Sequence, residues 1–260
     1  MTGQVQLRHE GSLAVVTLSH PGKLNAMSRA MWRALRTVFE GIQASADVRC
    51  VLIRGDAGHF CAGGDIAEYT GFRFSEGSLR DFHENDVWGG LQAMLDCDVP
   101  VVALLEGNCM GAGLEIASCC DIRIAAQSAR FGAPIAKLGF PMAPREAALV
   151  LRTVGALTAR EMLLQAAVLD APAMLQRGFL NQVVQDGQAA AAALAATQRI
   201  GQLAPQAARL NKQTFRVLAL AQTTPIAPDL IASCYRYADS AEHREGVSAF
   251  IEKRSPQFPR

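Results

Sequence analysis

The sequence predicts an α/β domain with layered sheets, followed by a helical C-terminal region. Short apolar and β-branched runs alternate with amphipathic segments in the first half of the chain. Several of these runs lead into glycine-containing turns that open helices. After about Pro144 the pattern becomes mainly helical. We therefore divide the chain into an α/β core, residues 1–200, and a C-terminal helical region, residues 201–260.

The N-terminal segments follow this alternation closely. Residues 15–18 are apolar or β-branched and predict a strand. Ser28 is a suitable N-cap for a helix that continues to about Gln43. The apolar face of that helix consists of Met31, Leu35, Val38, Phe39 and Ile42. Residues 50–53 predict a second, buried strand, so the order is strand, helix, strand.

The middle of the chain continues in the same way. We expect a helix over residues 79–95 and an apolar strand over residues 99–105. The strand leads into the turn Gly111-Ala112-Gly113, from which a short helix starts at Leu114. A further strand is expected over residues 122–125. Repeated strand, turn and helix units of this kind are typical of α/β domains.

After about Pro144, most of the sequence signals are those of helix N-termini. Thr158 and Glu161 have the spacing of a capping box, and Asp170 precedes Ala171-Pro172, a common helix opening. Further helices are expected over residues 188–203, 204–220, 225–237 and 241–252. Such a helical tail packs either on its own domain or on a neighbouring subunit, and the sequence leaves both open.

The composition narrows the classes of function. Half of the 260 residues are hydrophobic, which suits a large buried core. Lys and Arg total 25 against 24 Asp and Glu, so charge gives no support for nucleic-acid or membrane-surface binding. No apolar run approaches the roughly 18 residues of a membrane span. The first ten residues do not resemble a signal peptide, and we expect a cytoplasmic protein.

The seven cysteines form no CxxC pair, and two of them, Cys119 and Cys120, are adjacent. A disulfide framework is not expected in a chain of this length, and the spacing of metal ligands is missing. We therefore expect reduced, mostly buried thiols, no metal site and no redox cofactor.

The first turn with possible chemistry is Gly111-Ala112-Gly113-Leu114-Glu115. Backbone N–H groups at the start of the following helix can stabilise a developing oxyanion. A dinucleotide-binding fingerprint is excluded because the third glycine position holds Ile116. Glu115 is either a carboxylate that favours the helix N-terminus or a general acid/base.

A second turn of small residues lies within residues 60–66, FCAGGDI, and also follows a buried strand. Two such turns can direct two backbone N–H donors at one carbonyl oxygen, as an enolate-forming site requires. Neither turn contains a serine, which argues against a serine nucleophile.

At this point the sequence resembles a known family. The segments HPGKLNAM (residues 20–27), FCAGGDI (60–66), GNCMGAGLEIASCCDIRIA (107–125), FGAP (131–134) and REGVSAFIEKRSPQF (244–258) have the order and spacing of the enoyl-CoA hydratase/isomerase (crotonase) family. The resemblance covers almost the whole chain. It implies a spiral of repeated β-β-α units with a helical C-terminal trimerisation region. It also implies homotrimers, or hexamers made of two trimers.

The resemblance further implies an acyl-CoA site. Its oxyanion hole would consist of the backbone N–H groups of Ala62 and Ala112. The implied substrate- and CoA-binding positions are Lys23, Leu24, Ala62, Gly64, Asp65, Ile66, Gly111, Ile135, Phe250 and Lys253. For Lys253, a phosphate contact and a solvated helix face both remain open. Coenzyme A would enter as part of the substrate, so no separate cofactor is expected.

The most informative departure concerns the two glutamates of the family's hydratases. The first matches Glu115, but the second falls at Ile135, which cannot exchange a proton. Glu106, Lys137, Arg145 and Glu146 are possible substitutes, although a surface or ion-pair role is expected for each. The segment 71–90, with Phe72, Phe74, Phe82 and Trp88, is expected to border the acyl pocket or to pack in the core.

Hydration of a 2-enoyl-CoA through a stabilised enolate is the function that this pattern favours. Isomerisation, decarboxylation or hydrolysis of an acyl-CoA would use the same enolate. Ile135 would then be an apolar part of the site, suited to a substrate that needs no activated water. An acyl-CoA-binding protein without turnover is the alternative from another class. The acyl group and the pathway are not given by the sequence.

Overall fold

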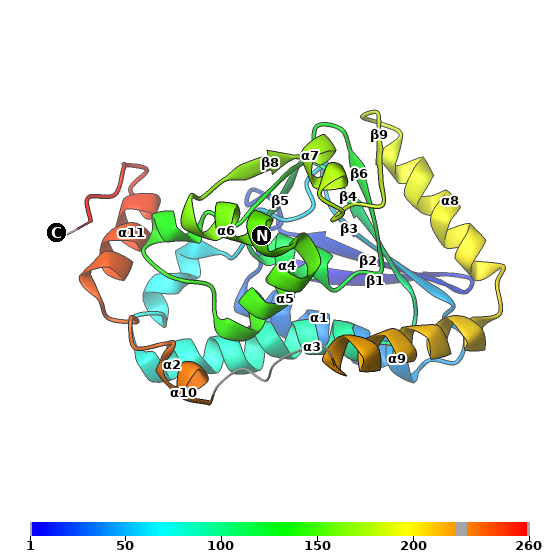
Figure 1. Cartoon of the computed structure of the whole chain (residues 1–260), viewed down its shortest axis with the longest axis horizontal. Coiled ribbons are helices and arrows are strands. Elements are labelled where there is room, and N and C mark those ends of the chain that lie inside the picture. Colours follow the sequence, from blue (N-terminus) through cyan, green and yellow to red (C-terminus); the bar gives the residue numbers. More distant parts are fainter. Residues whose placement is uncertain (1, 222–227, 259–260) are drawn as a thin grey trace.

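A computed structural model gives the structure of the chain and describes residues 2–221 and 228–258. Two sheets and a set of surrounding helices build the fold (Figure 1). The larger sheet has the order β1-β2-β3-β4-β6-β9. Its strands are β1 (Gln4–Glu10), β2 (Leu13–Ser19), β3 (Cys50–Gly55), β4 (Val101–Leu105), β6 (Ile122–Ala126) and β9 (Gln182–Val184).

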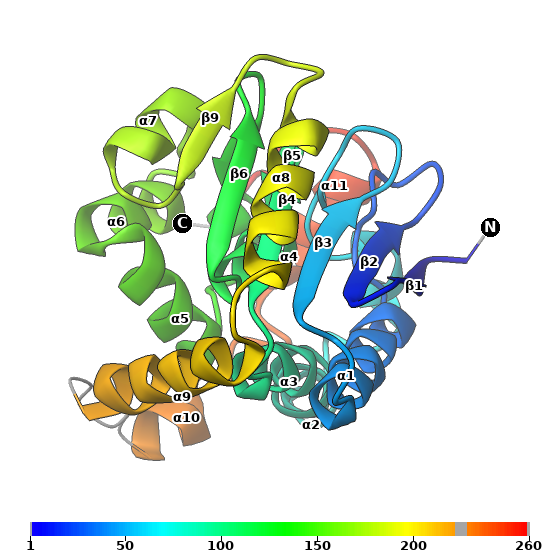
Figure 2. The same cartoon turned by 90° about the vertical axis from the view of Figure 1, so that its right-hand side faces the viewer.

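The larger sheet is parallel except for the antiparallel pair β1 and β2. All residues of β4 are buried, as expected for a central strand with both faces covered. Helix α8 (Ala189–Gly201) lies across one face (Figure 2), where Ala189 and Ala193 pack against Leu52 and Val102. Helices α1 (Arg29–Ala44) and α3 (Trp88–Asp96) contribute to the main core on the other side.

A smaller sheet contains β5 (Asn108–Met110), β7 (Arg130–Gly132) and β8 (Val168–Asp170), with β5 and β7 parallel. Between β5 and β6 the chain forms the short helix α4 (Ala112–Ser118). Strands and helices that alternate in this way confirm the predicted α/β class, and the smaller sheet adds the second layer.

The predicted N-terminal helix is α1 (Arg29–Ala44). Its N-cap is Ser28, whose hydroxyl accepts a hydrogen bond from the Met31 N–H at 3.2 Å. Four of the five apolar residues predicted for its face are buried: Met31, Leu35, Phe39 and Ile42. This helix and its cap confirm the prediction.

The helix predicted over residues 79–95 is interrupted. It consists of α2 (Glu76–Asp81), a π-helical segment η2 (Phe82–Val87) and α3 (Trp88–Asp96). A π-helical turn accommodates an extra residue and is often found at functional sites. Before it, a 3-10 segment η1 (Ile66–Gly71) follows the FCAGGDI turn. These irregular segments were not predicted.

The C-terminal half is helical with two short strands, β8 and β9, that the sequence pattern did not indicate. The helices are α5 (Pro144–Val154), α6 (Ala156–Leu164), α7 (Ala171–Gln176), α9 (Pro205–Ala221), α10 (Pro228–Ser233) and α11 (Ala241–Ile251), and η3 (Ile135–Leu138) is a 3-10 segment.

Two helix starts test the sequence signals directly. Asp170 caps α7 by accepting a hydrogen bond from the Ala173 N–H at 2.9 Å, as predicted. The capping box at Thr158 was wrong, because α6 already begins after Gly155 and Thr158 is a buried residue within it. Part of the helix predicted over residues 225–237 lies outside the described residues.

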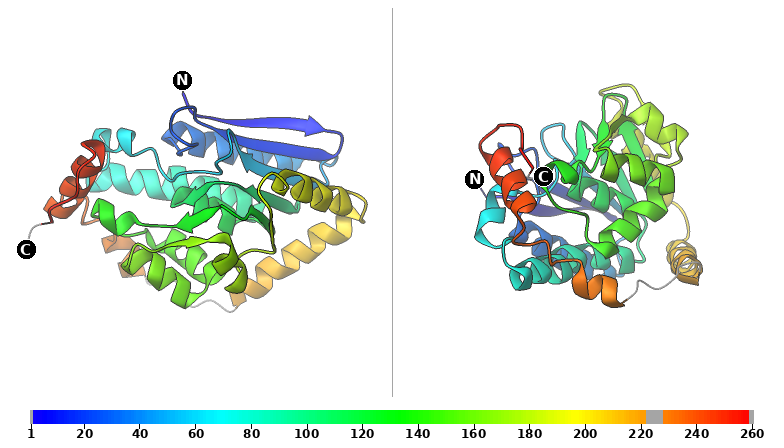
Figure 3. Two further views of the ribbon diagram at one scale, coloured as in Figure 1. Left: turned by 90° about the horizontal axis from the view of Figure 1, so that it is seen from above. Right: turned by 60° about the vertical axis from the view of Figure 1, so that its left-hand side comes forward.

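The C-terminal segment returns to the core. Helix α11 packs against η1 and η3 at one end of the molecule, while α9 runs along an outer face (Figure 3). All seven cysteines are free and six are buried, as expected. No helix among residues 2–221 and 228–258 is long and apolar enough to cross a bilayer.

Candidate active site

The two small-residue turns lie side by side. A parallel bridge joins Cys61 to Cys109. The Cys61 N–H donates to the Asn108 carbonyl at 2.8 Å, and the Met110 N–H donates to the Cys61 carbonyl at 2.9 Å. A Cβ added at Gly111 would lie 3.6 Å from the Gly63 Cα. The backbone itself therefore brings the two turns together.

Several backbone N–H groups in these turns have no hydrogen-bond acceptor among the described residues, and those of Gly64 and Ala112 are among them. Ala112 is the first residue of α4, where an amide has no partner within the helix. The preceding Gly111 has φ 47° and ψ −110°, a conformation that favours glycine. Free donors from two converging turns have the character of an oxyanion hole.

The Ala62 N–H, in contrast, donates to the Leu24 carbonyl at 3.0 Å. This hydrogen bond argues against the prediction that the Ala62 amide is a free oxyanion donor. The amide of Gly64, two residues later in the same turn, has no acceptor among the described residues.

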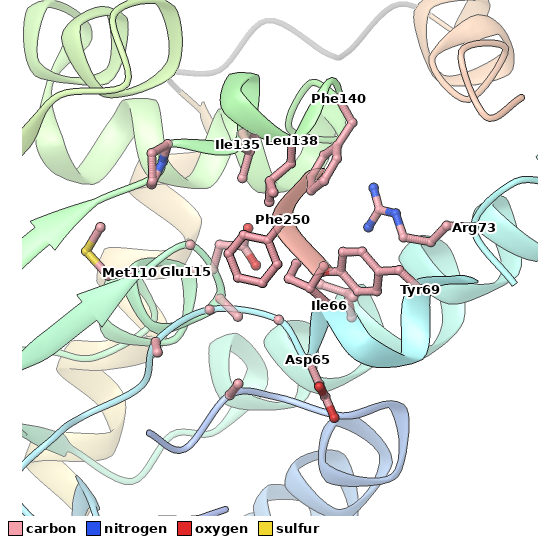
Figure 4. A pocket seen from close by; sticks show the side chains of 18 of the residues that line it. Asp65, Ile66, Tyr69, Arg73, Met110, Glu115, Ile135, Leu138, Phe140 and Phe250 are labelled. Carbon is pink, nitrogen blue, oxygen red and sulfur yellow. The ribbon is translucent and has the colours of Figure 1, made fainter. Parts of the chain in front are cut away.

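Both turns open into a cavity of about 570 Å³ (Figure 4). The size is within the usual range for small-molecule sites. The predicted residues Lys23, Leu24, Ala62, Gly64, Asp65, Ile66, Gly111, Ala112, Glu115, Ile135 and Phe250 all line it. Lys253 does not: it is exposed beyond the end of α11. The structure thus brings together every predicted site residue except this lysine.

An ion pair and two exposed apolar side chains mark the cavity entrance. The Lys23 Nζ lies 2.6 Å from the Asp65 Oδ2, which ties the loop before α1 to the second turn. Leu24 and Phe250 line the cavity although they are 47% and 57% exposed. Phe250 comes from α11 of the same chain. The C-terminal segment therefore reaches the cavity within one chain, through Phe250.

Glu115 faces the cavity from the first turn of α4. Burial first and the nearby Glu146 carboxylate second raise the pKa of its carboxyl to about 8, against the opposing effect of the Arg73 guanidinium. Glu115 is consequently protonated at neutral pH. A neutral carboxylic acid in an apolar cavity can donate a proton to a substrate.

A buried pair of titratable side chains lies near Glu115. The His83 Nδ1 is 3.0 Å from the Glu146 Oε1, and Glu146 is only 2% exposed. The His83 ring stacks on Tyr235 with centroids 5.6 Å apart. Burial lowers the pKa of His83, and its Nε2 has no hydrogen-bond partner among the described residues. His83 lines the cavity as a neutral imidazole.

Of the surface or ion-pair role that was expected for Glu146, the surface location is wrong, because the side chain is buried, whereas it does pair with His83. Ile135 lies in η3 and lines the same cavity, so its side chain is an apolar part of the wall. Of the aromatic residues expected near an acyl pocket, Phe82 lines the cavity, whereas Phe72, Phe74 and Trp88 pack against the core.

A family model described as "Enoyl-CoA hydratase/isomerase" matches residues 8–260. The chain belongs to the enoyl-CoA hydratase/isomerase family. The short-chain-enoyl-CoA hydratase of Clostridium acetobutylicum is 32% identical to it over 255 residues, covering 96% of this chain and 95% of that protein. This confirms the family resemblance of the sequence.

Solved structures agree. An enoyl-CoA hydratase/carnitine racemase from Magnetospirillum magneticum has a TM-score of 0.81 and 35% identity, with 100% of this chain and 96% of that one covered. A methylmalonyl-CoA decarboxylase in complex with 2-nitronate-propionyl-CoA has a TM-score of 0.87 and 26% identity, with 98% of each chain covered. The crotonase-like fold is thereby confirmed, and acyl-CoA thioesters are the substrates of this family.

In this enzyme of the enoyl-CoA hydratase/isomerase family, the sequence motifs predicted the two turns that form the backbone part of the site. They did not predict the polar side chains on the other side of the cavity. Arg73, His83, Glu146 and Tyr69 belong to no motif that the sequence indicated. His83 stands in the π-helical segment and Glu146 in the first turn of α5. The sequence signal that was available for them is a polar residue on an otherwise apolar helix face. This signal does not show which of these residues contact one another in the fold.

Proposed function

We propose that this protein hydrates a 2-enoyl-CoA, with Glu115 as the acid. The observation that carries the proposal is a neutral Glu115 beside two unpaired backbone donors in one apolar cavity. The thioester oxygen would accept hydrogen bonds from the N–H groups of Gly64 and Ala112. The Ala112 N–H opens α4, so the helix dipole adds to the stabilisation.

The oxyanion donors are made of backbone and are already in place. When water adds to C3, the electrons of the double bond move towards the thioester carbonyl, and its oxygen gains negative charge. Fixed donors stabilise this charge without reorganisation, which is worth about 3 kcal/mol per donor in comparable sites. Glu115 then gives its proton to C2, and the thioester carbonyl is restored.

Water must also lose a proton during addition. We assign this step to His83, because it is neutral and the Glu146 carboxylate accepts a hydrogen bond from its Nδ1–H. The water proton passes to the Nε2, and its return to the Glu115 carboxylate completes the cycle. His83 and Glu146 would thus supply the function that Ile135 cannot.

A second candidate is another reaction through the same enolate, such as decarboxylation. The apolar Ile135 side chain favours it, because such a reaction needs no activated water. The likeness to methylmalonyl-CoA decarboxylase is in agreement with this alternative. Acyl-CoA binding without turnover is the third outcome that the experiment below distinguishes.

We also propose a cytoplasmic homotrimer or a hexamer of two trimers. The buried free thiols suit a reducing compartment. Helix α9 holds the core through polar contacts, such as Arg216 Nη2 to Asp98 Oδ1 at 2.5 Å, and leaves large apolar residues exposed. These exposed residues are Leu210, Phe215, Val217 and Leu218. Sedimentation velocity tests the assembly, and a monomer would contradict it.

The central experiment follows the loss of enoyl-thioester absorbance with crotonyl-CoA and hex-2-enoyl-CoA. Four variants accompany the wild type: Glu115→Gln, His83→Gln, Ile135→Glu and, as the control, Glu106→Gln, whose side chain does not line the cavity. We expect hydration that is lost in Glu115→Gln, lowered about a hundredfold in His83→Gln and unchanged in the control.

No hydration, with intact binding of a saturated acyl-CoA, would overturn the proposal. Product release from a malonyl-type thioester would then identify the decarboxylase, and binding alone would identify the non-catalytic protein. Hydration that appears only in Ile135→Glu would show that the missing carboxylate is the limiting group.

A further inference from the structure

Three cations line the cavity: Lys23, Arg73 and Lys137. Lys23 is paired with Asp65 at 2.6 Å, and Lys137 is exposed to solvent. Arg73 is different, because it is 1% exposed and no carboxylate of the described residues lies within ion-pair distance of it. An unpaired charge that is taken out of water is costly and calls for an explanation.

All the polar partners of Arg73 are neutral. Its Nη2 donates to the Tyr237 hydroxyl at 3.1 Å, and its Nε donates to the His243 Nε2 at 3.4 Å. Burial lowers the pKa of His243 to about 4, so this ring is uncharged. Burial raises the pKa of the Tyr69 phenol, and the positive charge of Arg73 opposes this shift, so the phenol is also neutral.

Aromatic faces complete the surroundings of the guanidinium. Its central carbon lies 4.0 Å from the ring centroid of Phe140 and 4.3 Å from that of Tyr69. Such contacts hold a cation in place at low dielectric without neutralising it. Figure 4 shows the Arg73 guanidinium on the same side of the cavity as Phe140 and Tyr69.

The acids Glu115 and Glu146 do not form an ion pair with Arg73. Glu115 is protonated at neutral pH, as its raised pKa shows. Glu146 is bonded to His83. The charges of Glu146 and Arg73 both affect the pKa of Glu115, yet neither Glu115 nor Glu146 forms an ion pair with the Arg73 guanidinium. The described residues therefore provide a buried cation without a direct counter-ion in the wall of an acyl-CoA cavity.

Tyr69 relates this cation to the reacting end of the substrate. A side chain at Gly64 would collide with the Tyr69 hydroxyl, so this hydroxyl touches the oxyanion turn. The face of the same ring contacts Arg73. Arg73 thus lies beyond Tyr69 as seen from the thioester position, where the acyl group would extend.

We propose that the acyl group of the substrate carries a carboxylate at the end remote from the thioester, and that this carboxylate pairs with Arg73. The inference rests on the proposed function in taking this cavity as the acyl-CoA site, and it goes further by naming a dicarboxylic acyl group. A guanidinium is suited to this role because its planar donors match a carboxylate and it stays charged when buried.

The test measures binding, so that it does not depend on turnover. Isothermal titration calorimetry compares adipyl-CoA with hexanoyl-CoA, which have the same chain length and differ in the terminal carboxylate. We expect the wild type to bind adipyl-CoA about tenfold more tightly or better, as a charge-assisted hydrogen-bonded pair implies. Equal affinities, or tighter binding of hexanoyl-CoA, would overturn the proposal.

Three variants assign the preference to Arg73. Arg73→Met should abolish it while retaining hexanoyl-CoA binding, which also reports that the site is folded. Arg73→Lys should keep a weaker preference, because the charge remains without the paired donors. Lys137→Met is the matched control on the exposed cation and should keep the full preference. A preference that is lost in Lys137→Met and kept in Arg73→Met would overturn the assignment.

Kinetics then separate this inference from the proposed function. Hydration of 2,3-dehydroadipyl-CoA in preference to hex-2-enoyl-CoA would support both. A binding preference without hydration of either would support the carboxylate site and reject the hydratase. Hydration of both with equal efficiency would support the hydratase and reject the carboxylate site.

Discussion

The two sides of the cavity are built in different ways. On one side, the turns that contain Gly64 and Ala112 present backbone N–H groups, and a parallel bridge between Cys61 and Cys109 fixes their distance. On the other side, Arg73 from the turn after η1 and His83 from η2 line the cavity, and Glu146 of α5 is hydrogen-bonded to His83 from behind. The backbone side stabilises an enolate from any acyl-CoA, whereas the side-chain side selects the acyl group and moves protons.

The largest effect is expected where the two sides meet. Glu115→Gln removes the proton donor beside the oxyanion donors and should lower kcat for hydration about a thousandfold. Affinity for a saturated acyl-CoA should remain within a few-fold of the wild type, because the amide is nearly isosteric. Stopped-flow kinetics and calorimetry measure the two quantities. An unchanged kcat would assign the proton transfer to the side-chain cluster alone.

The backbone side is tested by Gly64→Ala. The new methyl group would collide with the Tyr69 hydroxyl and displace the turn, so we expect kcat/KM to fall about a hundredfold. Gly71→Ala is the matched control, since a Cβ there meets no atom within 4 Å. Tyr69→Phe combined with Gly64→Ala should recover part of the loss. Full activity of Gly64→Ala would contradict the assignment of this turn.

The pH profile shows how the two sides are coupled. Glu115 is active in its protonated form, and its pKa is raised to about 8 by burial and by Glu146. We expect kcat for hydration to fall about tenfold per pH unit above that value. In Glu146→Gln the lost carboxylate should move the alkaline limit to lower pH. A limit that stays in place would mean that Glu146 does not act on Glu115.

The smallest expected effect is on the free energy of unfolding, through the titration of Glu115. The folded-state pKa of Glu115 lies above its unfolded value, so the native state binds the extra proton and loses stability as the pH rises from about 4.5 to about 8. Glu115→Gln removes this penalty and should raise the free energy of unfolding at pH 8 by on the order of 2 kcal/mol. Urea unfolding of the wild type and the variant at pH 4 and at pH 8 measures this effect. The same difference in free energy of unfolding between the two proteins at both pH values would contradict the linkage.

The same contrast explains what the sequence could predict. The Ser28 cap and the two turns depend on residues close in sequence, and their spacing was readable. The Ala62 donor was assigned two residues too early, since only the hydrogen bond to Leu24 shows that this amide is occupied. The contact between His83 and Glu146 joins residues 63 positions apart, and no local pattern indicates such a meeting.

Arg73 shows the physical reason most clearly. In the sequence it is an ordinary basic residue in a loop, which is usually solvated. Its burial follows from α11 packing on η1: His243 of α11 and Tyr237 of the turn before α11 both contact its guanidinium. Contacts between segments far apart in the sequence therefore determine the environment of Arg73, and this environment in turn determines the electrostatics of the cavity.

The π-helical segment η2 gives this enzyme a way to change one side of its cavity without changing its motifs. Successive residues of a regular helix differ by roughly 100° in direction, since one turn takes 3.6 residues. The gain or loss of one residue within Phe82–Val87 would therefore rotate His83 away from the cavity and bring a different side chain into the wall. A single codon inserted or deleted here would thus remove the base that we assign to His83 and alter the cavity wall, while both oxyanion turns stay intact.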